Sequence, residues 1–240
     1  MPTATVTDDL YPTRLTEAAA PTERVHPTVW GTAADGPFDA EELRAHDERG
    51  FSILPGTLTG GEIETYSREL ERLTTDETLR GDERVITEKG SGEVRSIFAV
   101  QHRSELIDDL SRDPRLLERA RQLLGSDVYL HQTRINYMPG FKGAGFYWHS
   151  DFETWHAEDG MPAPRAVSCS LALTPNYPYN GGLMVMPGSH RTFVPSLGET
   201  PEDNHRSSLK EQKAGIPSEE VITQMAHRHG IDQFTGPAGS

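Results

Sequence analysis

Hydrophobic positions recur at helical spacing through much of the first half of the chain, and they alternate with polar positions through much of the second half. Because a helix repeats about every 3.6 residues and a strand every two, these patterns predict helices first and strands afterwards. The helices are expected at 39–49, 60–73, 104–124 (broken by Pro114) and about 219–227. The strands are expected at 51–54, 94–100, 128–137, around His149, at 166–173 and at 182–186, with a loop at 75–93.

Capping residues mark the ends of three of these helices. Asp39 opens the first helix, with acidic residues in its first turn, and Gly50 follows its last turn. Thr59 stands before the second helix, and Gly125 follows the third. Asp and Thr side chains accept hydrogen bonds from the N–H groups at a helix start, and glycine adopts the left-handed conformation that commonly ends a helix. These boundaries therefore depend on local chemistry.

Helices followed by strands that Gly- and Pro-containing turns connect are typical of a β-sandwich or jelly roll with helices packed outside. We therefore predict a mainly β fold with flanking helices, formed by one domain from residue 37 to 240. Residues 1–36 are rich in Pro, Thr and Ala and show no clear period, which predicts an irregular N-terminal arm that lies over the domain. Folds of this kind bind ligands at the mouth or between the sheets.

The charge of the chain narrows the range of partners. The chain has 240 residues, of which 37 are acidic and 23 are Lys or Arg, and its net charge is −14. Nucleic-acid binders carry a basic surface and anionic membranes attract basic segments, so neither partner is expected. The first nine residues lack the basic and apolar pattern of a leader, which favours a cytoplasmic location. The single cysteine, Cys169, lies in an apolar run and is expected to be a buried structural thiol.

The strongest functional signal is the segment 146–156, where aromatic residues surround His149 and Asp151. On a strand, residues two apart point to the same face and lie roughly 7 Å apart. An imidazole and a carboxylate that project together supply two-thirds of the facial site that holds ferrous iron and leaves positions open for oxygen chemistry. A His-x-Asp triplet alone is a weak signal, but the aromatic residues around it would wall off a dry pocket.

Longer motifs carry a more specific resemblance. A resemblance to the ectoine hydroxylases is carried by the segments 132–136, 148–162 and 183–190, of which the last ends in Pro-Gly-Ser-His. The ectoine hydroxylases belong to the phytanoyl-CoA dioxygenase-like group of iron(II)- and 2-oxoglutarate-dependent oxygenases. The similarity covers roughly residues 50–240. It implies a double-stranded β-helix core of the jelly-roll or cupin-like kind. It also implies a reaction that converts ectoine, 2-oxoglutarate and O2 to 5-hydroxyectoine, succinate and CO2, as part of compatible-solute synthesis under osmotic stress.

The resemblance also implies roles for single residues. The catalytic iron ligands would be His149 and Asp151. The residues around ectoine would be Gln132, Arg134, Thr154 and Trp155. The residues around 2-oxoglutarate would be Phe98, Asn136, Met138 and Ser168.

The chemistry of these residues agrees with the implied roles. Gln132, Arg134 and Asn136 share one face of a strand, so three polar groups converge. Arg134 can pair with the ectoine carboxylate, and Trp155 can offer a ring face to the delocalised cation. A solvated sheet face is the alternative for the three polar residues.

Two departures from the pattern of relatives affect these expectations. Met138 stands where relatives commonly carry a lysine linked to the cosubstrate, and whether Lys142 compensates is open. In the family, the last iron-binding histidine and an arginine for 2-oxoglutarate lie on strands that follow the segment matching 236–240. We therefore expect a C-terminally incomplete core, and weak iron binding and poor turnover by these 240 residues alone.

Other functions stay open at this point. The domain could act on a different small substrate, or it could be a non-catalytic β-sandwich that binds a small molecule. A hydrolytic metal site built from His149, Asp151 and His156 would need a strand break at Thr154. His190 is expected to be structural, and His227 and His229 to be solvated. The sequence also leaves a homodimer open.

Overall fold

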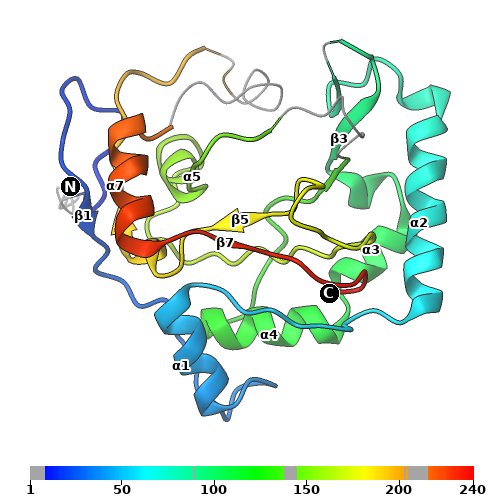
Figure 1. The fold of residues 1–240 in the computed structure, drawn as a ribbon, viewed down its shortest axis with the longest axis horizontal. Helices are drawn as coiled ribbons and strands as arrows, with labels where there is room; N and C mark the ends of the chain where they lie inside the picture. The colour runs from blue at the N-terminus through cyan, green and yellow to red at the C-terminus, as the bar shows by residue number, and fades with distance from the viewer. Residues whose placement is uncertain (1–8, 89, 138–144, 203, 205–215) are drawn as a thin grey trace, which may run out of the picture. The chain divides into compact units, whose positions relative to one another are not determined.

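The computed structural model describes residues 9–88, 90–137, 145–202, 204 and 216–240, and Figure 1 shows its ribbon. Its residues form two compact units: Met1–His26, Tyr147–Pro164 and Arg191–Gln224 make the first, and Pro27–Phe146, Arg165–His190 and Met225–Ser240 make the second. The α-helices are α1 (Ala40–Arg49), α2 (Gly60–Thr75), α3 (Glu105–Ser111), α4 (Pro114–Leu124), α5 (Phe152–Asp159) and α7 (Glu219–His229). The strands are β1 (Thr22–Glu23), β2 (Val85–Thr87), β3 (Val94–Phe98), β4 (Arg134–Asn136), β5 (Met184–Val185), β6 (Thr192–Phe193) and β7 (Asp232–Gln233).

The helices of the second unit begin and end where the capping residues predict. The Asp39 carboxylate accepts hydrogen bonds from the N–H groups of Glu41 and Glu42, each at 2.8 Å, and Gly50 closes α1 in the left-handed conformation with φ of 82°. Thr59 forms the same reciprocal cap at the start of α2. The predicted break at Pro114 is also confirmed, since α3 ends at Ser111 and Pro114 is the first residue of α4.

A three-stranded antiparallel sheet in the order β2-β3-β4 belongs to the second unit. In its register, Ile97 of β3 lies opposite Ile135 of β4, and Phe98 lies opposite Arg134. The core beneath it consists of Leu73, Leu79, Ile97 and Val100, with Ile135 and Tyr137 packed against it. Helix α2 contributes Leu73 to this core, so α2 packs against the sheet. Figure 1 shows α2 on the side of β3.

A second core of the same unit joins α1 and α4, and one polar side chain organises it. Phe38, Leu43 and Leu123 form this core. Beside them Gln122 is completely buried, and its Oε1 accepts a hydrogen bond from the Phe38 N–H at 2.8 Å. Its Nε2 donates to the carbonyl oxygens of Phe38 at 2.7 Å and of Thr32 at 2.9 Å. One amide therefore satisfies three backbone groups of the segment that leads into α1.

Strands β5 and β7 also pair antiparallel in the second unit, side by side in Figure 1. The turn after β5 carries His190, whose Nε2 lies 3.0 Å from the Asp47 carbonyl oxygen of α1. The His190 ring packs so closely on Gly50 that a Cβ atom there would clash with it. His229 is similarly engaged, with its Nδ1 3.0 Å from the Pro187 carbonyl oxygen. The structural role expected for His190 is therefore confirmed.

The N-terminal arm contributes to the core of the first unit. Strand β1 pairs antiparallel with β6, and Tyr11, Phe152 and Phe193 pack as a buried aromatic cluster. The ring centroid of Tyr11 lies 5.1 Å from that of Phe152 and 5.2 Å from that of Phe193. Aromatic rings in such edge-on arrangements stabilise a core beyond the area that they bury. The domain boundary expected near residue 36 stays a prediction.

Several predicted strands are wrong or shorter than expected. Only Arg134–Asn136 of the predicted 128–137 strand is extended and paired, and β5 covers only part of 182–186. No strand forms at 51–54 or at 166–173, and the predicted loop at 75–93 contains β2. The segment around His149 is a bend that leads into α5. Strand formation requires a partner distant in sequence, which apolar runs alone do not identify.

Two further observations concern exposure. Cys169 is exposed, so the expectation of a buried thiol is wrong. Within the part of the chain that the structure describes, no helix is both long and apolar enough to cross a bilayer.

Candidate metal centre

His149 and Asp151 lie together in the first unit, just before α5. The His149 Nε2 atom is 3.4 Å from the Asp151 Oδ1 atom. This proximity was predicted, but its cause was not. A bend brings the two side chains together, with Asp151 at the N-cap of α5 and φ and ψ of −73° and −30°, in place of the alternation of a strand.

The second ring nitrogen of His149 decides which tautomer the imidazole adopts. Its Nδ1 atom lies 2.7 Å from the carbonyl oxygen of Tyr147, which can only accept a hydrogen bond. Nδ1 therefore carries a proton, which leaves Nε2 as the ring nitrogen available to a metal ion. Metal-binding histidines in proteins are typically held in this way, by a backbone carbonyl or carboxylate on the nitrogen that does not bind the metal.

The geometry of the pair fits a divalent transition-metal ion. Metal–nitrogen and metal–oxygen bonds of about 2.1 Å at a right angle would place the two donor atoms about 3.0 Å apart. The separation of 3.4 Å between Nε2 and Oδ1 is close to this value. Imidazole combined with carboxylate is the donor set that suits non-haem ferrous iron when coordination positions are left open.

Helix α5 fixes the carboxylate side of the pair. The carbonyl oxygen of Asp151 accepts hydrogen bonds from the N–H groups of Thr154 and Trp155, at 3.1 and 3.0 Å. Its side chain makes no capping hydrogen bond to the helix.

Two residues predicted to contact substrate follow on α5. Thr154 and Trp155 are both partly buried. The Thr154 Oγ1 atom is fully buried, and within the described residues no hydrogen-bond partner for it is found. A buried hydroxyl without a protein partner is costly, and a polar ligand or water would supply the missing hydrogen bond.

Sequence reasoning missed Arg24 and Glu153, which surround the bend. The Arg24 Nη2 atom donates to Ser150 Oγ at 3.0 Å and approaches Glu153 Oε1 at 3.4 Å. Glu153 is buried, although its type is rarely buried unless it is paired. An acidic residue just after Asp151 was a usable helix-start signal, but nothing in the sequence indicates that Arg24 would reach it.

His156 does not complete a three-ligand site. Its Nδ1 atom lies 2.6 Å from the Met161 carbonyl oxygen, and its Nε2 atom lies 3.0 Å from Asp9 Oδ1. Both ring nitrogens are thus engaged away from His149. Across the described ranges, no group of three His, Cys, Asp or Glu side chains is placed to hold a metal ion. The alternative of a hydrolytic site built on His156 is therefore not supported.

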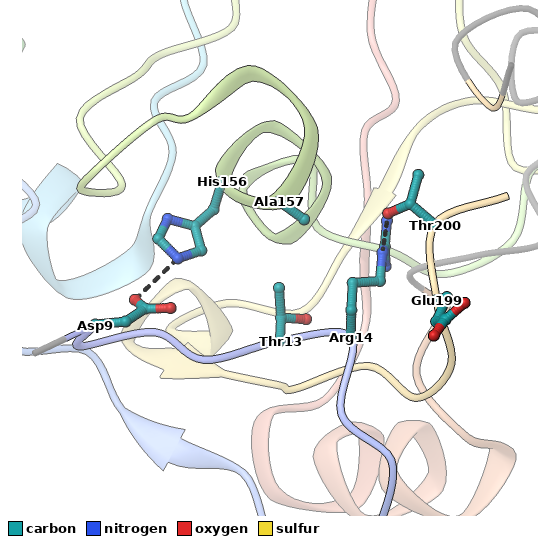
Figure 2. Close-up of a pocket in the computed structure, with 7 residues that line it drawn as sticks. All are labelled: Asp9, Thr13, Arg14, His156, Ala157, Glu199 and Thr200. Atoms are coloured by element: carbon teal, nitrogen blue, oxygen red, sulfur yellow. Dashed lines mark hydrogen bonds and ion pairs between the residues drawn. The ribbon is translucent and has the colours of Figure 1, made fainter. Parts of the chain in front are cut away.

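The His156–Asp9 pair instead lines a pocket of about 430 Å³, which Figure 2 shows. Opposite it, Arg14 donates from Nε to Thr200 Oγ1 at 3.1 Å and from Nη2 to Glu158 Oε1 at 2.9 Å. Burial acts to raise the pKa of Asp9, but hydrogen bonds from the Tyr11 N–H and the His156 ring outweigh it and lower that pKa. The polar groups here largely satisfy one another, and none of the predicted site residues lies in this pocket.

In the second unit, part of the predicted polar face lies on β4. Gln132, Arg134 and Asn136 are exposed, while the residues between them are partly buried against the core. The Ser96 hydroxyl donates to Asn136 Oδ1 at 2.8 Å, which orients the amide so that its NH2 group faces away as a donor. Buried Phe98 lies opposite Arg134 in the register. Arg134 and Asn136 are two residues apart on β4, whereas Gln132 lies outside that strand, so the convergence of all three on one pocket stays a prediction.

Two more residues were predicted to lie around 2-oxoglutarate, Ser168 and Met138. Ser168 is exposed and belongs to no helix or strand. Met138 lies outside the described residues, as does Lys142.

Comparison with known proteins defines the family. The model of the phytanoyl-CoA dioxygenase family, PhyH, matches residues 46–230. The chain therefore belongs to the phytanoyl-CoA dioxygenase family. The family expected from the motifs around His149 is confirmed.

Individual relatives within the family narrow the comparison to ectoine dioxygenases. The ectoine dioxygenase of Nocardia farcinica is 61% identical over 232 residues, which cover 97% of this chain and 76% of the relative. The ectoine dioxygenase of Halomonas elongata is 52% identical over 233 residues, covering 96% of this chain and 70% of the relative. The crystal structure of EctD from S. alaskensis with bound Fe superposes with a TM-score of 0.85 at 41% identity, covering 97% and 77% of the two chains. The EctD structure with 2-oxoglutarate and 5-hydroxyectoine superposes with a TM-score of 0.83 and similar coverage.

Proposed function

We propose that this chain hydroxylates ectoine to 5-hydroxyectoine and couples that reaction to the oxidative decarboxylation of 2-oxoglutarate. The observation that carries the proposal is the convergence of His149 Nε2 and Asp151 Oδ1, with the imidazole tautomer fixed by Tyr147. The high identity to ectoine dioxygenases of several organisms supports the substrate. The resemblance to EctD also supports a double-stranded β-helix as the underlying fold.

His149 and Asp151 would hold ferrous iron. When bound, the iron supplies oxygen chemistry in which O2 and 2-oxoglutarate yield succinate, CO2 and a hydroxyl group on the substrate. The Tyr147 carbonyl would leave Nε2 as the metal-binding nitrogen, and the start of α5 fixes the backbone of Asp151. These residues thus prepare the site before any ligand arrives.

For the cosubstrate, we assign Asn136, Phe98, Ser168 and Met138. The Asn136 NH2 group, oriented by Ser96, is a donor suited to a carboxylate or keto oxygen. Phe98 provides an apolar wall, and the Ser168 hydroxyl is a further donor. The assignment of Met138 rests on the family pattern alone.

For ectoine, we assign Arg134, Gln132, Thr154 and Trp155. The exposed guanidinium of Arg134 can form a two-point pair with the ectoine carboxylate. Trp155 offers an aromatic face for the cationic ring. The Thr154 hydroxyl, buried without a protein partner in the described part of the chain, would gain a hydrogen bond to the substrate.

The test is a coupled product assay. The chain is incubated with iron(II), 2-oxoglutarate, ectoine and O2, and succinate and 5-hydroxyectoine are measured together. His149→Ala should lower both products at least about 100-fold, because a metal ligand is lost. The control is His102→Ala, since His102 is an exposed histidine in the second unit outside the proposed site.

Each result has a distinct meaning. Succinate without 5-hydroxyectoine would indicate a different substrate of the same enzyme class. No succinate from the wild-type chain, together with ectoine binding that does not depend on iron(II), would favour a small-molecule-binding protein. Wild-type rates from His149→Ala would exclude that residue as an iron ligand.

Two further predictions accompany the function. The small-molecule chemistry fits a cytoplasmic enzyme, which fractionation of cells would test. A homodimer is the second, and sedimentation of the purified chain would test it.

A further inference from the structure

The N-terminal arm places one guanidinium group against the bend that carries the two proposed iron ligands. Arg24 Nη2 donates to Ser150 Oγ at 3.0 Å, and Ser150 is the residue between His149 and Asp151. The same Nη2 atom lies 3.4 Å from Glu153 Oε1, on the first turn of α5. The two side chains of this ion pair are only 13% and 4% exposed.

Three other contacts fix where the guanidinium lies. The Arg24 N–H donates to the Arg191 carbonyl oxygen at 2.8 Å, which continues the pairing of β1 with β6. The guanidinium carbon lies 5.2 Å from the centre of the Phe152 ring, at the distance of a cation–π contact. Glu153 Oε1 also accepts a hydrogen bond from the Val194 N–H at 3.3 Å, so the chain just after β6 holds the carboxylate as well.

We propose that Arg24 is a positioning residue of the metal centre. It fixes the chain on both sides of Asp151, through Ser150 before it and Glu153 after it. This proposal rests on the proposed function, because it assumes that His149 and Asp151 bind the metal.

The physical reason is that a metal ion binds more tightly when its donor atoms are already in place. Within the residues that the structure describes, the bend belongs to no strand, and side-chain contacts hold it on the Arg24 side. An ion pair with little solvent exposure is stronger than one in water, and loss of Arg24 would leave the Glu153 carboxylate without its counter-charge. The bend would then sample conformations in which Nε2 and Oδ1 diverge. Residues that orient metal ligands typically change metal affinity by about 10–100-fold.

A matched residue separates positioning from general support of the arm. Arg14 belongs to the same arm and the same unit, and its Nη2 pairs with Glu158 Oε1 at 2.9 Å with side-chain exposures of 9% and 14%. It also donates to Ser196 Oγ at 2.6 Å. Among the described residues, its hydrogen bonds and ion pair reach Thr200, Ser196 and Glu158 and not the 149–153 segment. Loss of Arg14 should therefore loosen the arm without disturbing the bend.

The experiment measures cobalt(II) binding, since cobalt(II) is stable in air and its visible spectrum reports coordination geometry. Arg24→Gln is expected to raise the Kd for cobalt(II) about tenfold and to alter the spectrum of the bound ion. Arg24→Lys should recover part of the affinity, because an ammonium group can still pair with Glu153. Arg14→Gln should leave the affinity within about twofold of wild type and the spectrum unchanged, and His149→Ala should lose binding.

Amide hydrogen exchange without metal is the second measurement. Residues 147–153 should exchange faster in Arg24→Gln than in Arg14→Gln. If Arg24→Gln does not fold, Ser150→Ala replaces it, because that change removes only the hydroxyl that accepts from Arg24. It should weaken cobalt(II) binding about threefold.

The outcomes distinguish the two proposals. Wild-type cobalt(II) affinity and spectrum in Arg24→Gln, or in Ser150→Ala if only that variant folds, would overturn the positioning role while leaving the metal centre intact. Unchanged binding in His149→Ala, or no binding by the wild-type chain, would overturn the metal centre instead. In that case, the exchange rates of residues 147–153 still decide whether Arg24 holds the bend.

Discussion

Replacement of Gln122 by Met should destabilise the protein strongly, although Gln122 is not one of the residues proposed to bind iron, ectoine or 2-oxoglutarate. Met has nearly the same length and similar helix propensity, so the substitution removes the amide and little else. The Phe38 N–H, the Phe38 carbonyl and the Thr32 carbonyl would each lose a hydrogen bond to this side chain. The N–H and carbonyl of Phe38 belong to a buried residue that water does not readily reach.

The expected magnitude follows from these three groups. A buried donor or acceptor left unpaired costs about 1–3 kcal/mol, so the two Phe38 groups cost about 4 kcal/mol, while the carbonyl of exposed Thr32 can bond to water instead. Burial of the more apolar Met side chain returns about 1–2 kcal/mol. We therefore expect the free energy of unfolding to fall by about 2–3 kcal/mol, a large fraction of the 5–15 kcal/mol typical of folded domains.

Urea denaturation followed by circular dichroism measures this difference. The control is Gln224→Met, because Gln224 lies on α7 and is exposed, so the same substitution there should change stability by less than about 0.5 kcal/mol. A loss below about 1 kcal/mol for Gln122→Met would refute the reasoning. It would mean that the three backbone groups find other partners at little cost.

Two further predictions test charge and backbone conformation. The hydrogen bonds from Arg115 lower the pKa of Glu62 to about 2, below its unfolded value of 4.5, so Glu62 stabilises the fold above pH 4.5 and that contribution is lost as the pH falls toward 2. The difference in Tm between wild type and Glu62→Gln should accordingly be constant above pH 5 and shrink at lower pH, and a pH-independent difference would contradict it. Gly125→Ala should destabilise by about 1–3 kcal/mol in urea denaturation, because φ is +58° and the new Cβ would lie 2.9 Å from the Trp30 backbone. Gly60→Ala, whose Cβ would meet nothing within 4 Å, should change stability by less than about 0.5 kcal/mol.

The helices of this protein could be predicted from sequence because their ends depend on neighbours in sequence. Asp39 and Glu42 form a reciprocal cap within four residues, and Gly125 ends α4 through its own conformational freedom. The strands could not be predicted as well. The run 166–173 is apolar, but the structure gives it no strand partner, and β1 is only two residues of a polar arm that pairs with β6.

The candidate site shows the same division between local and distant causes. His149 and Asp151 were identified because they are two residues apart, although a bend and not a strand brings them together. The helical spacing of Phe152, Trp155 and His156 was a usable signal for α5 that the expectation of a strand concealed. Arg24 could not have been found, since its partnership with Glu153 depends on how the arm folds back.

The close packing of His190 on Gly50 also constrains how this sequence can diverge. Any side chain larger than hydrogen at position 50 would displace the imidazole that reaches the Asp47 carbonyl, and the left-handed backbone there disfavours other residues independently. Substitution of Gly50 is therefore disfavoured while His190 is retained, and the two positions can change only together. The Pro-Gly-Ser-His motif is thus inherited together with the end of a helix.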